Sequence, residues 1–237
     1  YENNVLGTIN LVEAMKEFKV NKLIFSSSAV VYGDNKNLAC KETQISKSTN
    51  PYALTKLTCE RYFSDLTNKS RNWKIISLRY FNPVGNHPSG LIGDNPTKAN
   101  NIMPILNEVA IGKKKKFNVF GKNYKTKDGT AIRDFVHVMD VASAHYAALK
   151  NINRINGHTI FNIGTGKGTS VLELFNTYKF VNKLKIKNIF SKRRQGDIAV
   201  SFANVTKAKR FLKWKTKYTL KDICISAYTF AKNYIWK

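Results

Sequence analysis

The chain has 237 residues, 43% of them hydrophobic, which is enough to bury one large domain or two unequal ones. Forty Lys and Arg against 15 Asp and Glu give a formal net charge of +25, a field that attracts nucleic acid and anionic surfaces. The lysines are spread along the chain without a nucleic-acid-binding motif, so they indicate a solvated surface. No stretch approaches the length of apolar residues that spans a membrane. We therefore expect neither a nucleic-acid nor a membrane partner.

Three cysteines, Cys40, Cys59 and Cys224, fit no metal-binding or redox spacing. Their odd number and wide separation indicate idle thiols in a reducing compartment, which favours a cytoplasmic location. The four histidines also lack metal-ligand spacing, and the sequence contains no HExxH motif. We expect no metal site.

The first part of the chain alternates helical and strand patterns. Residues 5–18 carry apolar side chains at helical spacing, and residues 22–33 form an apolar run that enters a small-residue loop. An Asn-Pro pair predicts the start of a helix over 52–67, and residues 74–85 predict a second strand. Such alternation is typical of a parallel sheet with crossover helices. The predicted fold class is α/β, with residues 1–85 forming part of a Rossmann-like, doubly wound parallel sheet.

A second, smaller α/β domain is predicted over residues 86–237. Within it, Ser170 and Glu173 form a capping-box motif that predicts the start of a helix. The predicted elements are a Gly/Pro/Asn-rich loop over 86–100, a helix over 101–111, strands near 117–121 and 133–138, a helix over 139–150, a strand over 158–164, the helix opened by Ser170 and a terminal helix near 219–234.

The glycine-rich segment 164–168 (GTGKG) follows a predicted strand and precedes a helix, as a dinucleotide-binding loop would. It lacks the GxGxxG spacing, and no acidic residue lies about 20 positions later to bind a ribose. We interpret it as a tight structural turn.

The chemically informative residues are Ser28, Tyr52 and Lys56. Tyr52 and Lys56 lie four positions apart on a predicted helix and so share a face. Ser28 ends a predicted strand, and α/β sheets bind ligands at the carboxyl ends of their strands. A lysine beside a tyrosine stabilises the phenolate and makes it a usable base for a hydroxyl group. YxxxK alone also arises by chance as a helix-face tyrosine with a surface lysine, but the motifs on both flanking strands favour a catalytic role.

Longer motifs extend along the whole chain. They are SSSAVVYG (26–33), NPYALTK (50–56), LRYFNPVGNHPSG (78–90), NNIMP (100–104), NVFG (118–121), DGTAIRDFVHVMD (128–140), FNIGTG (161–166) and RRQGD (193–197). In order and approximate spacing they resemble UDP-galactose 4-epimerase, an extended short-chain dehydrogenase/reductase. The resemblance implies NAD as cofactor, a UDP-sugar as substrate, and interconversion of UDP-galactose and UDP-glucose at C4 through a 4-keto intermediate.

The resemblance also assigns residue roles. Tyr52 is similar to the residue that accepts the proton of the sugar 4-hydroxyl, Lys56 to the lysine that binds the nicotinamide ribose, and Ser28 to the serine that bridges sugar and tyrosine. The implied cofactor contacts are Asn3, Ser28, Tyr52, Lys56, Tyr80 and Phe81. The implied substrate contacts are Ser28, Ala29, Val30, Asn82, Asn101, Ile102, Asn118, Phe120, Arg133, Arg194, Asp197 and Ser201.

The resemblance further implies that the two parts of the chain bind different ligands. Residues 1–85 would be the C-terminal half of the NAD-binding domain, and residues 86–237 would bind the UDP-sugar. It implies a homodimer formed through the helices at 5–18 and 52–67. Ser201 occupies a position where a bulky tyrosine goes with strict hexose epimerases and smaller residues with enzymes that also accept N-acetylated sugars.

Two features depart from the family pattern. The NAD-binding glycine loop and its flanking βαβ units, roughly 60–90 residues, do not occur in the sequence, so we expect an N-terminal part to be missing and the chain alone to be inactive. A non-catalytic remnant or a basic binding protein on the same scaffold is the alternative. A second alternative is another extended short-chain dehydrogenase/reductase that acts on nucleotide sugars, although dehydratases and decarboxylases place an acidic residue where this chain has Ser28-Ala29-Val30.

Overall fold

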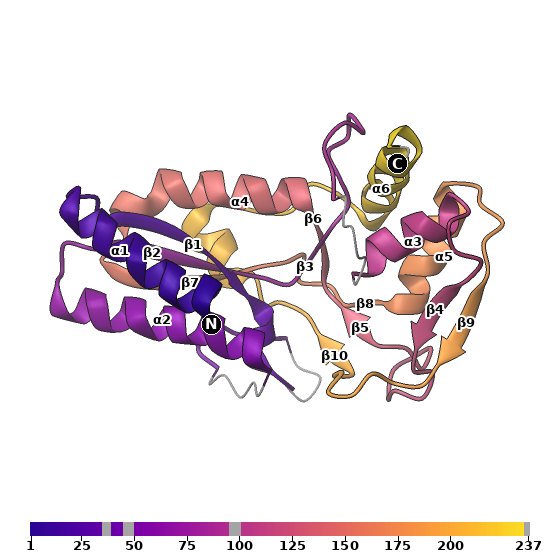
Figure 1. The fold of residues 1–237 in the computed structure, drawn as a ribbon, viewed down its shortest axis with the longest axis horizontal. Helices are drawn as coiled ribbons and strands as arrows, with labels where there is room; N and C mark the ends of the chain where they lie inside the picture. The colour runs from indigo at the N-terminus through magenta and orange to yellow at the C-terminus, as the bar shows by residue number, and fades with distance from the viewer. Residues whose placement is uncertain (35–38, 45–49, 95–100, 235–237) are drawn as a thin grey trace.

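The computed structural model describes residues 1–34, 39–44, 50–94 and 101–234, so residues 95–100 of the predicted loop lie outside the described residues. The chain folds as a mixed α/β structure with mainly parallel strands (Figure 1). In chain order the elements are η1 (Glu2–Leu6), α1 (Gly7–Glu17), β1 (Lys22–Ser28), η2 (Ala29–Tyr32), α2 (Pro51–Lys69), β2 (Lys74–Tyr80), β3 (Asn82–Val84), α3 (Ile102–Ala110), β4 (Phe117–Phe120), β5 (Ile132–Arg133), β6 (Phe135–His137), α4 (Val138–Asn151), η3 (Ile152–Arg154), β7 (Gly157–Ile163), β8 (Thr169–Ser170), α5 (Val171–Val181), β9 (Asn188–Ser191), β10 (Val200–Ser201), η4 (Ala208–Leu212) and α6 (Leu220–Asn233).

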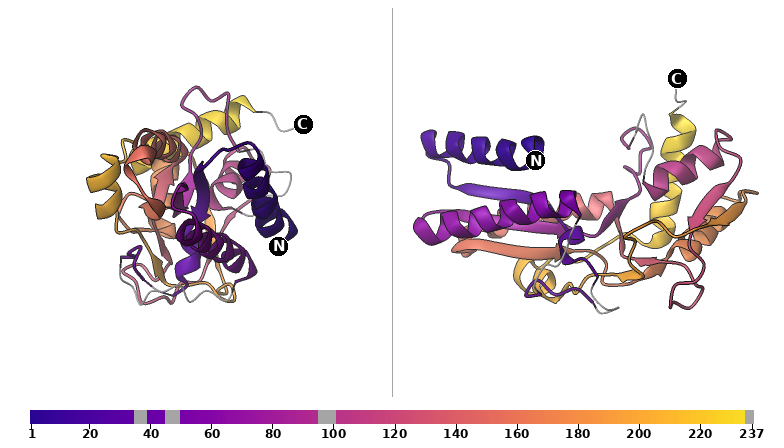
Figure 2. Two further views of the ribbon diagram at one scale, coloured as in Figure 1. Left: turned by 90° about the vertical axis from the view of Figure 1, so that its left-hand side faces the viewer. Right: turned by 60° about the horizontal axis from the view of Figure 1, so that its bottom comes forward.

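The largest sheet has three parallel strands in the order β1-β2-β7. Because side chains alternate along a strand, Leu23, Phe25 and Ile75 pack against α1 and α2, whereas Ile76 and Leu78 pack against α4. Helices therefore cover both faces of the sheet (Figures 1 and 2). This arrangement confirms the Rossmann-like α/β fold class.

Strand β7 joins the first sheet although it lies in the second half of the chain. It pairs with β2 along its whole length, and α4 leads into it. Phe161 and Ile163, which point to the same face of β7, are fully buried in the cluster that contains Val141 and Ala144 of α4. The domain boundary at residue 85 stays a prediction. In this structure, β7 and α4, which both follow that residue, belong to the first sheet and the layer that covers it.

Helices α3, α5 and α6 and the remaining strands form a second layered unit at the other end of the molecule (Figure 1). Helices α3, α5 and α6 pack on short strands around buried Leu106, Phe117, Phe175 and Tyr178. Strands β9 and β10 were not predicted, because each has four residues or fewer and shows no readable periodicity. No helix in the described ranges is long and apolar enough to cross a membrane.

The turn at 164–168 is structural, as predicted. Asp134, which is fully buried between β5 and β6, accepts hydrogen bonds from Thr165 N (2.7 Å), Gly166 N (3.0 Å) and Ala203 N (3.1 Å). Gly166 has φ +77°, a left-handed conformation that suits glycine. Since the carboxylate already occupies these N–H groups, they are not available to a phosphate.

A buried ion pair fixes α2 against the first sheet. Arg79 of β2 donates from Nε to Glu60 Oε1 (2.9 Å) and from Nη2 to Glu60 Oε2 (2.5 Å), and both side chains are less than 5% exposed. Ser27 Oγ of β1 also donates to Glu60 Oε1 (2.6 Å). One carboxylate on α2 is thus held by two adjacent strands, which sets the position of the helix along them.

Candidate active site

Helix α2 positions the predicted catalytic pair. Asn50 Oδ1 caps the helix by accepting from Tyr52 N (2.9 Å) and Ala53 N (3.4 Å), and Pro51 occupies the first turn. Tyr52 therefore lies in the first turn of α2 and Lys56 one turn later on the same face. Both lie at the end of the helix next to the carboxyl ends of β1 and β2.

The two side chains differ in their contact with solvent. Tyr52 is 49% exposed, and Lys56 Nζ lies 5.9 Å from its ring centroid. Lys56 Nζ donates to Ser26 O (3.0 Å) and lies 4.8 Å from the Phe25 ring centroid. Partial burial lowers the pKa of Lys56. An ammonium held beside a phenol is the charge that stabilises a phenolate, so the predicted pair has the geometry of a base and its positive neighbour.

The predicted serine ends β1. Ser28 Oγ accepts from Val30 N (3.3 Å) and so caps the short turn η2. Ala29 is 7% exposed and packs in the small core cluster with Val31 and Tyr32, whereas Val30 is half-buried. The side chain of Ala29 thus faces the core, and the contact predicted for it with substrate would have to involve its backbone.

The remaining predicted cofactor contacts lie around the same sheet edge. Tyr80 ends β2, and burial raises the pKa of its phenol. Phe81 follows it, is 7% exposed, and stacks on Tyr32 with 6.3 Å between ring centroids. Asn3 is exposed on η1, where Asn4 Nδ2 donates to Thr55 Oγ1 of α2 (3.1 Å).

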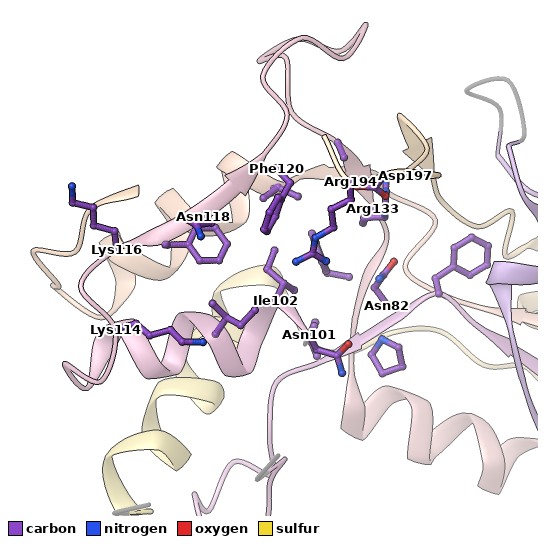
Figure 3. Close-up of a pocket in the computed structure, with 18 residues that line it drawn as sticks. Asn82, Asn101, Ile102, Lys114, Lys116, Asn118, Phe120, Arg133, Arg194 and Asp197 are labelled. Carbon is purple, nitrogen blue, oxygen red and sulfur yellow. The ribbon is translucent and has the colours of Figure 1, made fainter. Parts of the chain in front are cut away.

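A pocket of about 490 Å³ begins at Phe81 and Asn82, immediately after β2 (Figure 3). It brings together residues from six separate chain segments. Of the predicted substrate contacts, its walls contain Asn82, Asn101, Ile102, Asn118, Phe120, Arg133, Arg194 and Asp197. Ser28, Ala29, Val30 and Ser201 do not line it. Ser201 of β10 lies in register with Arg133 of β5 and so neighbours the pocket wall.

The two pocket arginines have different partners. Arg133 Nη2 makes an ion pair with Asp197 Oδ1, and Tyr124 Oη donates to Asp197 Oδ2 (3.3 Å). The Arg194 guanidinium stacks on Phe120, 4.0 Å from the ring centroid, and points into the pocket (Figure 3). Two guanidinium groups in one pocket next to an aromatic ring suit an anionic, planar-ringed ligand such as a nucleoside diphosphate.

Several pocket residues were missed by reasoning from the sequence. The sequence analysis did not single out Val84, Ile105 and Phe135, which form an apolar wall of the pocket. Lys114 and Lys116 belong to a lysine run that we interpreted as solvated surface, yet both line the far end of the pocket (Figure 3). Lys114 Nζ also pairs with Glu108 Oε2 (2.6 Å). A run of identical residues carries no signal of which members face inward.

The residues at the end of the first sheet fit the nicotinamide-ribose part of NAD. The Lys56 ammonium gives one of its three N–H donors to Ser26 O, so the others can bind the two hydroxyls of a ribose. The half-exposed phenol of Tyr52 lies within reach of the same space. The pyrophosphate is not accommodated at 164–168, because Asp134 takes those N–H groups.

A parallel sheet with a Tyr/Lys pair on the adjoining helix and a pocket beyond its carboxyl end defines an extended short-chain dehydrogenase/reductase. The sequence profile of the NAD dependent epimerase/dehydratase family matches residues 1–164, and the chain belongs to this family. It is 44% identical to UDP-glucose 4-epimerase 2 of Arabidopsis thaliana over 235 residues, which are 98% of this chain and 67% of that protein.

Solved structures agree in fold. A UDP-glucose-4-epimerase from Stenotrophomonas maltophila with bound NAD and formylated UDP-arabinopyranose superposes with a TM-score of 0.95 at 41% identity, over 98% of this chain and 69% of that one. A UDP-glucose 4-epimerase from Bifidobacterium longum in complex with NAD+ and UDP gives 0.93 at 40% identity, over 98% and 70%. The chain thus spans about two thirds of the length of these relatives.

Proposed function

We propose that the protein containing this chain is an NAD-dependent UDP-glucose 4-epimerase that interconverts UDP-galactose and UDP-glucose. The observation that carries the proposal is the pocket, in which eight predicted substrate contacts lie together and which begins where β2 ends. Its arginines suit the diphosphate, and the Tyr52–Lys56 pair lies at the carboxyl end of the same sheet.

Each residue has a role in the proposed reaction. Arg133 and Arg194 bind the diphosphate and hold the sugar toward the sheet. Lys56 stabilises Tyr52 as its phenolate, the phenolate accepts the proton of the sugar 4-hydroxyl and becomes the phenol, and Ser28 binds the same sugar oxygen. When bound, NAD would supply the hydride acceptor and donor for C4 of the sugar. The 4-keto sugar rotates between these two transfers, and Tyr52 then returns its proton to the oxygen on C4.

The product distinguishes this proposal from its alternatives. We expect UDP-galactose to give UDP-glucose of unchanged mass, measured by NMR and mass spectrometry of the NAD-loaded protein. A 4,6-dehydratase would instead release water, and a decarboxylase acting on a uronic acid would release carbon dioxide. Absence of turnover with NAD and UDP-sugar both bound would favour the non-catalytic remnant. That residues 1–237 alone are inactive stays a prediction.

We also propose that the enzyme accepts UDP-N-acetylglucosamine and UDP-N-acetylgalactosamine. The support is Ser201, which lies in register with Arg133 beside the pocket and occupies little volume there. A tyrosine at the same position would place a ring where an acetyl group has to fit, and a clash with a rigid wall is a strong means of rejection.

The variant Ser201→Tyr tests this specificity. We expect kcat/KM for the N-acetylated pair to fall by at least about tenfold, or 1.4 kcal/mol, with the plain hexoses nearly unaffected. Ser191→Tyr, on β9, is a control for a bulky residue elsewhere in the same unit. If the wild type rejects the acetylated sugars, or if Ser201→Tyr still accepts them equally well, Ser201 does not control the choice.

A further inference from the structure

A tight turn between β9 and β10 carries two residues of the pocket wall. Asp197 N donates to Arg194 O (3.2 Å), and Gly196 between them has φ +76°, a left-handed conformation that favours glycine. Arg194 points into the pocket (Figure 3), and Asp197 pairs with Arg133 of β5. Residues 192–199, all of them described, contain no helix or strand. The position of the turn therefore depends on contacts with neighbouring segments.

Two arginine–aromatic stacks hold the turn against the residues that end and follow β4. Arg194 stacks on Phe120, and both line the pocket. Arg193 stacks on Tyr124, with 3.9 Å from its guanidinium carbon to the ring centroid. This second stack is closely packed, because a Cβ added at Gly121 would lie 2.6 Å from the Tyr124 ring and 2.8 Å from Arg193 Cγ. Two neighbouring arginines thus fix the turn from different sides.

A single carboxylate connects Tyr124 to Arg133. Tyr124 is buried, and its Oη donates to Asp197 Oδ2 (3.3 Å), while Asp197 Oδ1 pairs with Arg133 Nη2. Arg133 Nη1 donates to Ile132 O (2.8 Å). A guanidinium has five N–H donors, so these two contacts orient its plane and leave three donors for a ligand in the pocket that it lines.

We propose that Tyr124 and Arg193 are positioning residues that hold Asp197, and through it Arg133, in the orientation that binds the diphosphate of the substrate. Neither Tyr124 nor Arg193 lines the pocket, so their effect on a ligand passes through the residues that do. An arginine that is already oriented loses less conformational freedom on binding than a mobile one. The diphosphate as ligand rests on the proposed function.

The variant Tyr124→Phe tests the role of the hydroxyl and keeps the ring on which Arg193 stacks. We measure the Kd of UDP, and of uridine, which lacks the diphosphate, by calorimetry on the full-length, NAD-loaded protein. The Kd of UDP should rise about three- to tenfold, the effect of one hydrogen bond, and that of uridine should not change. Tyr228→Phe, on α6 and outside the pocket wall, is the control and should match the wild type.

Three results would overturn the role of Tyr124. The first is a Tyr124→Phe protein that binds UDP as tightly as the wild type. The second is an equal loss of affinity for UDP and uridine, which would indicate general damage to the pocket. The third is a wild type that binds UDP no more tightly than uridine, because Arg133 would then bind no diphosphate.

A double-mutant cycle shows whether Tyr124 acts through Arg133. When Tyr124→Phe is added to Arg133→Ala, the Kd of UDP should stay that of Arg133→Ala alone, since the group that the hydroxyl positions is gone. If Tyr124→Phe weakens UDP binding by the same factor in both backgrounds, it does not act through Arg133, and the proposal fails.

The stack of Arg193 is tested against a matched loss of charge. Arg193→Ala removes the stack and should raise the Kd of UDP about as much as Tyr124→Phe does. Lys192→Ala removes an exposed positive charge one position earlier and should leave the Kd nearly unchanged at physiological salt. Equal effects of the two variants would show that Arg193 acts only through its charge.

Kinetics separate this inference from the proposed function. With UDP-galactose as substrate, Tyr124→Phe should raise KM by the same factor as the Kd of UDP and leave kcat within about twofold, because it weakens binding alone. If the Kd values change as expected but no epimerisation is found, the proposed function fails and the positioning role stands. If epimerisation is found and the Kd of UDP is the same in Tyr124→Phe and the wild type, the positioning role fails and the function stands.

Discussion

At the scale of single residues, the role of Tyr52 depends on what surrounds its oxygen. The ring is half exposed at the start of α2, and the Lys56 ammonium, which donates to Ser26 O, lies 5.9 Å from the ring centroid. Partial burial lowers the pKa of that lysine, so its charge is less completely screened than at a free surface. The phenol is therefore positioned to act on a ligand rather than to pack.

Tyr52→Phe removes only the phenol oxygen and should leave folding and NAD binding intact. We expect kcat for 4-epimerisation to fall about 10²- to 10⁴-fold, the usual contribution of a positioned general base. Turnover of UDP-galactose and the NAD content of the purified protein are the two measurements. Tyr62→Phe, on the same helix, is the matched control and should keep full activity. A Tyr52→Phe enzyme with near-normal turnover would show that another group is the base.

At the scale of elements, the buried pair Glu60–Arg79 holds α2 on the sheet. Glu60→Gln leaves Arg79 as an uncompensated buried charge, and breaking such a pair costs about 3–5 kcal/mol of unfolding free energy. Denaturant unfolding measures the loss. Glu13→Gln breaks the exposed bridge to Lys16 and should cost no more than about 1 kcal/mol. If the two variants lose the same unfolding free energy, the buried pair stabilises the docking of α2 no more than the exposed bridge stabilises its own helix.

His158 of β7 gives the interface between α2 and the sheet a pH dependence. Its ring lies between Ser64 Oγ (3.0 Å) and Ser77 Oγ (2.8 Å), and burial lowers its pKa to about 4 from an ordinary 6.5. The unfolded chain therefore binds a proton that the folded chain does not between these two values. The unfolding free energy should rise with pH through this window, by roughly 3 kcal/mol in total, and be constant above it.

The pH dependence is measured by urea unfolding between pH 4 and 7. The difference in unfolding free energy between wild type and His158→Gln isolates this residue from the carboxylates that titrate nearby. His87→Gln, in the loop after β3, is the control and should leave the curve unchanged. A wild-type curve that runs parallel to that of His158→Gln would exclude the buried imidazole as the cause.

At the scale of the whole molecule, we propose the homodimer that the family resemblance implies. Helix α1 packs on α2 with Val12 and Met15 but leaves Leu11 51% exposed and, just beyond its end, Phe18 74% exposed. Leu11→Lys should shift the sedimentation coefficient from dimer to monomer, because it places a charge in an apolar interface. Leu149→Lys, at a comparably exposed leucine of α4, should not. A wild-type monomer would contradict the proposal.

The sequence by itself determined the features that depend on neighbouring residues. The capping box of Ser170 and Glu173 and the N-cap of α2 are local hydrogen-bond patterns, and both are present in the structure. The spacing of Tyr52 and Lys56 on one helical face follows from helix geometry. Only the tertiary structure decided which distant segments meet. Asp134 reaches the turn at 164–168, and Tyr80 meets His145, 65 positions away. No local pattern encodes such contacts, because they arise when separate strands and helices pack into one sheet.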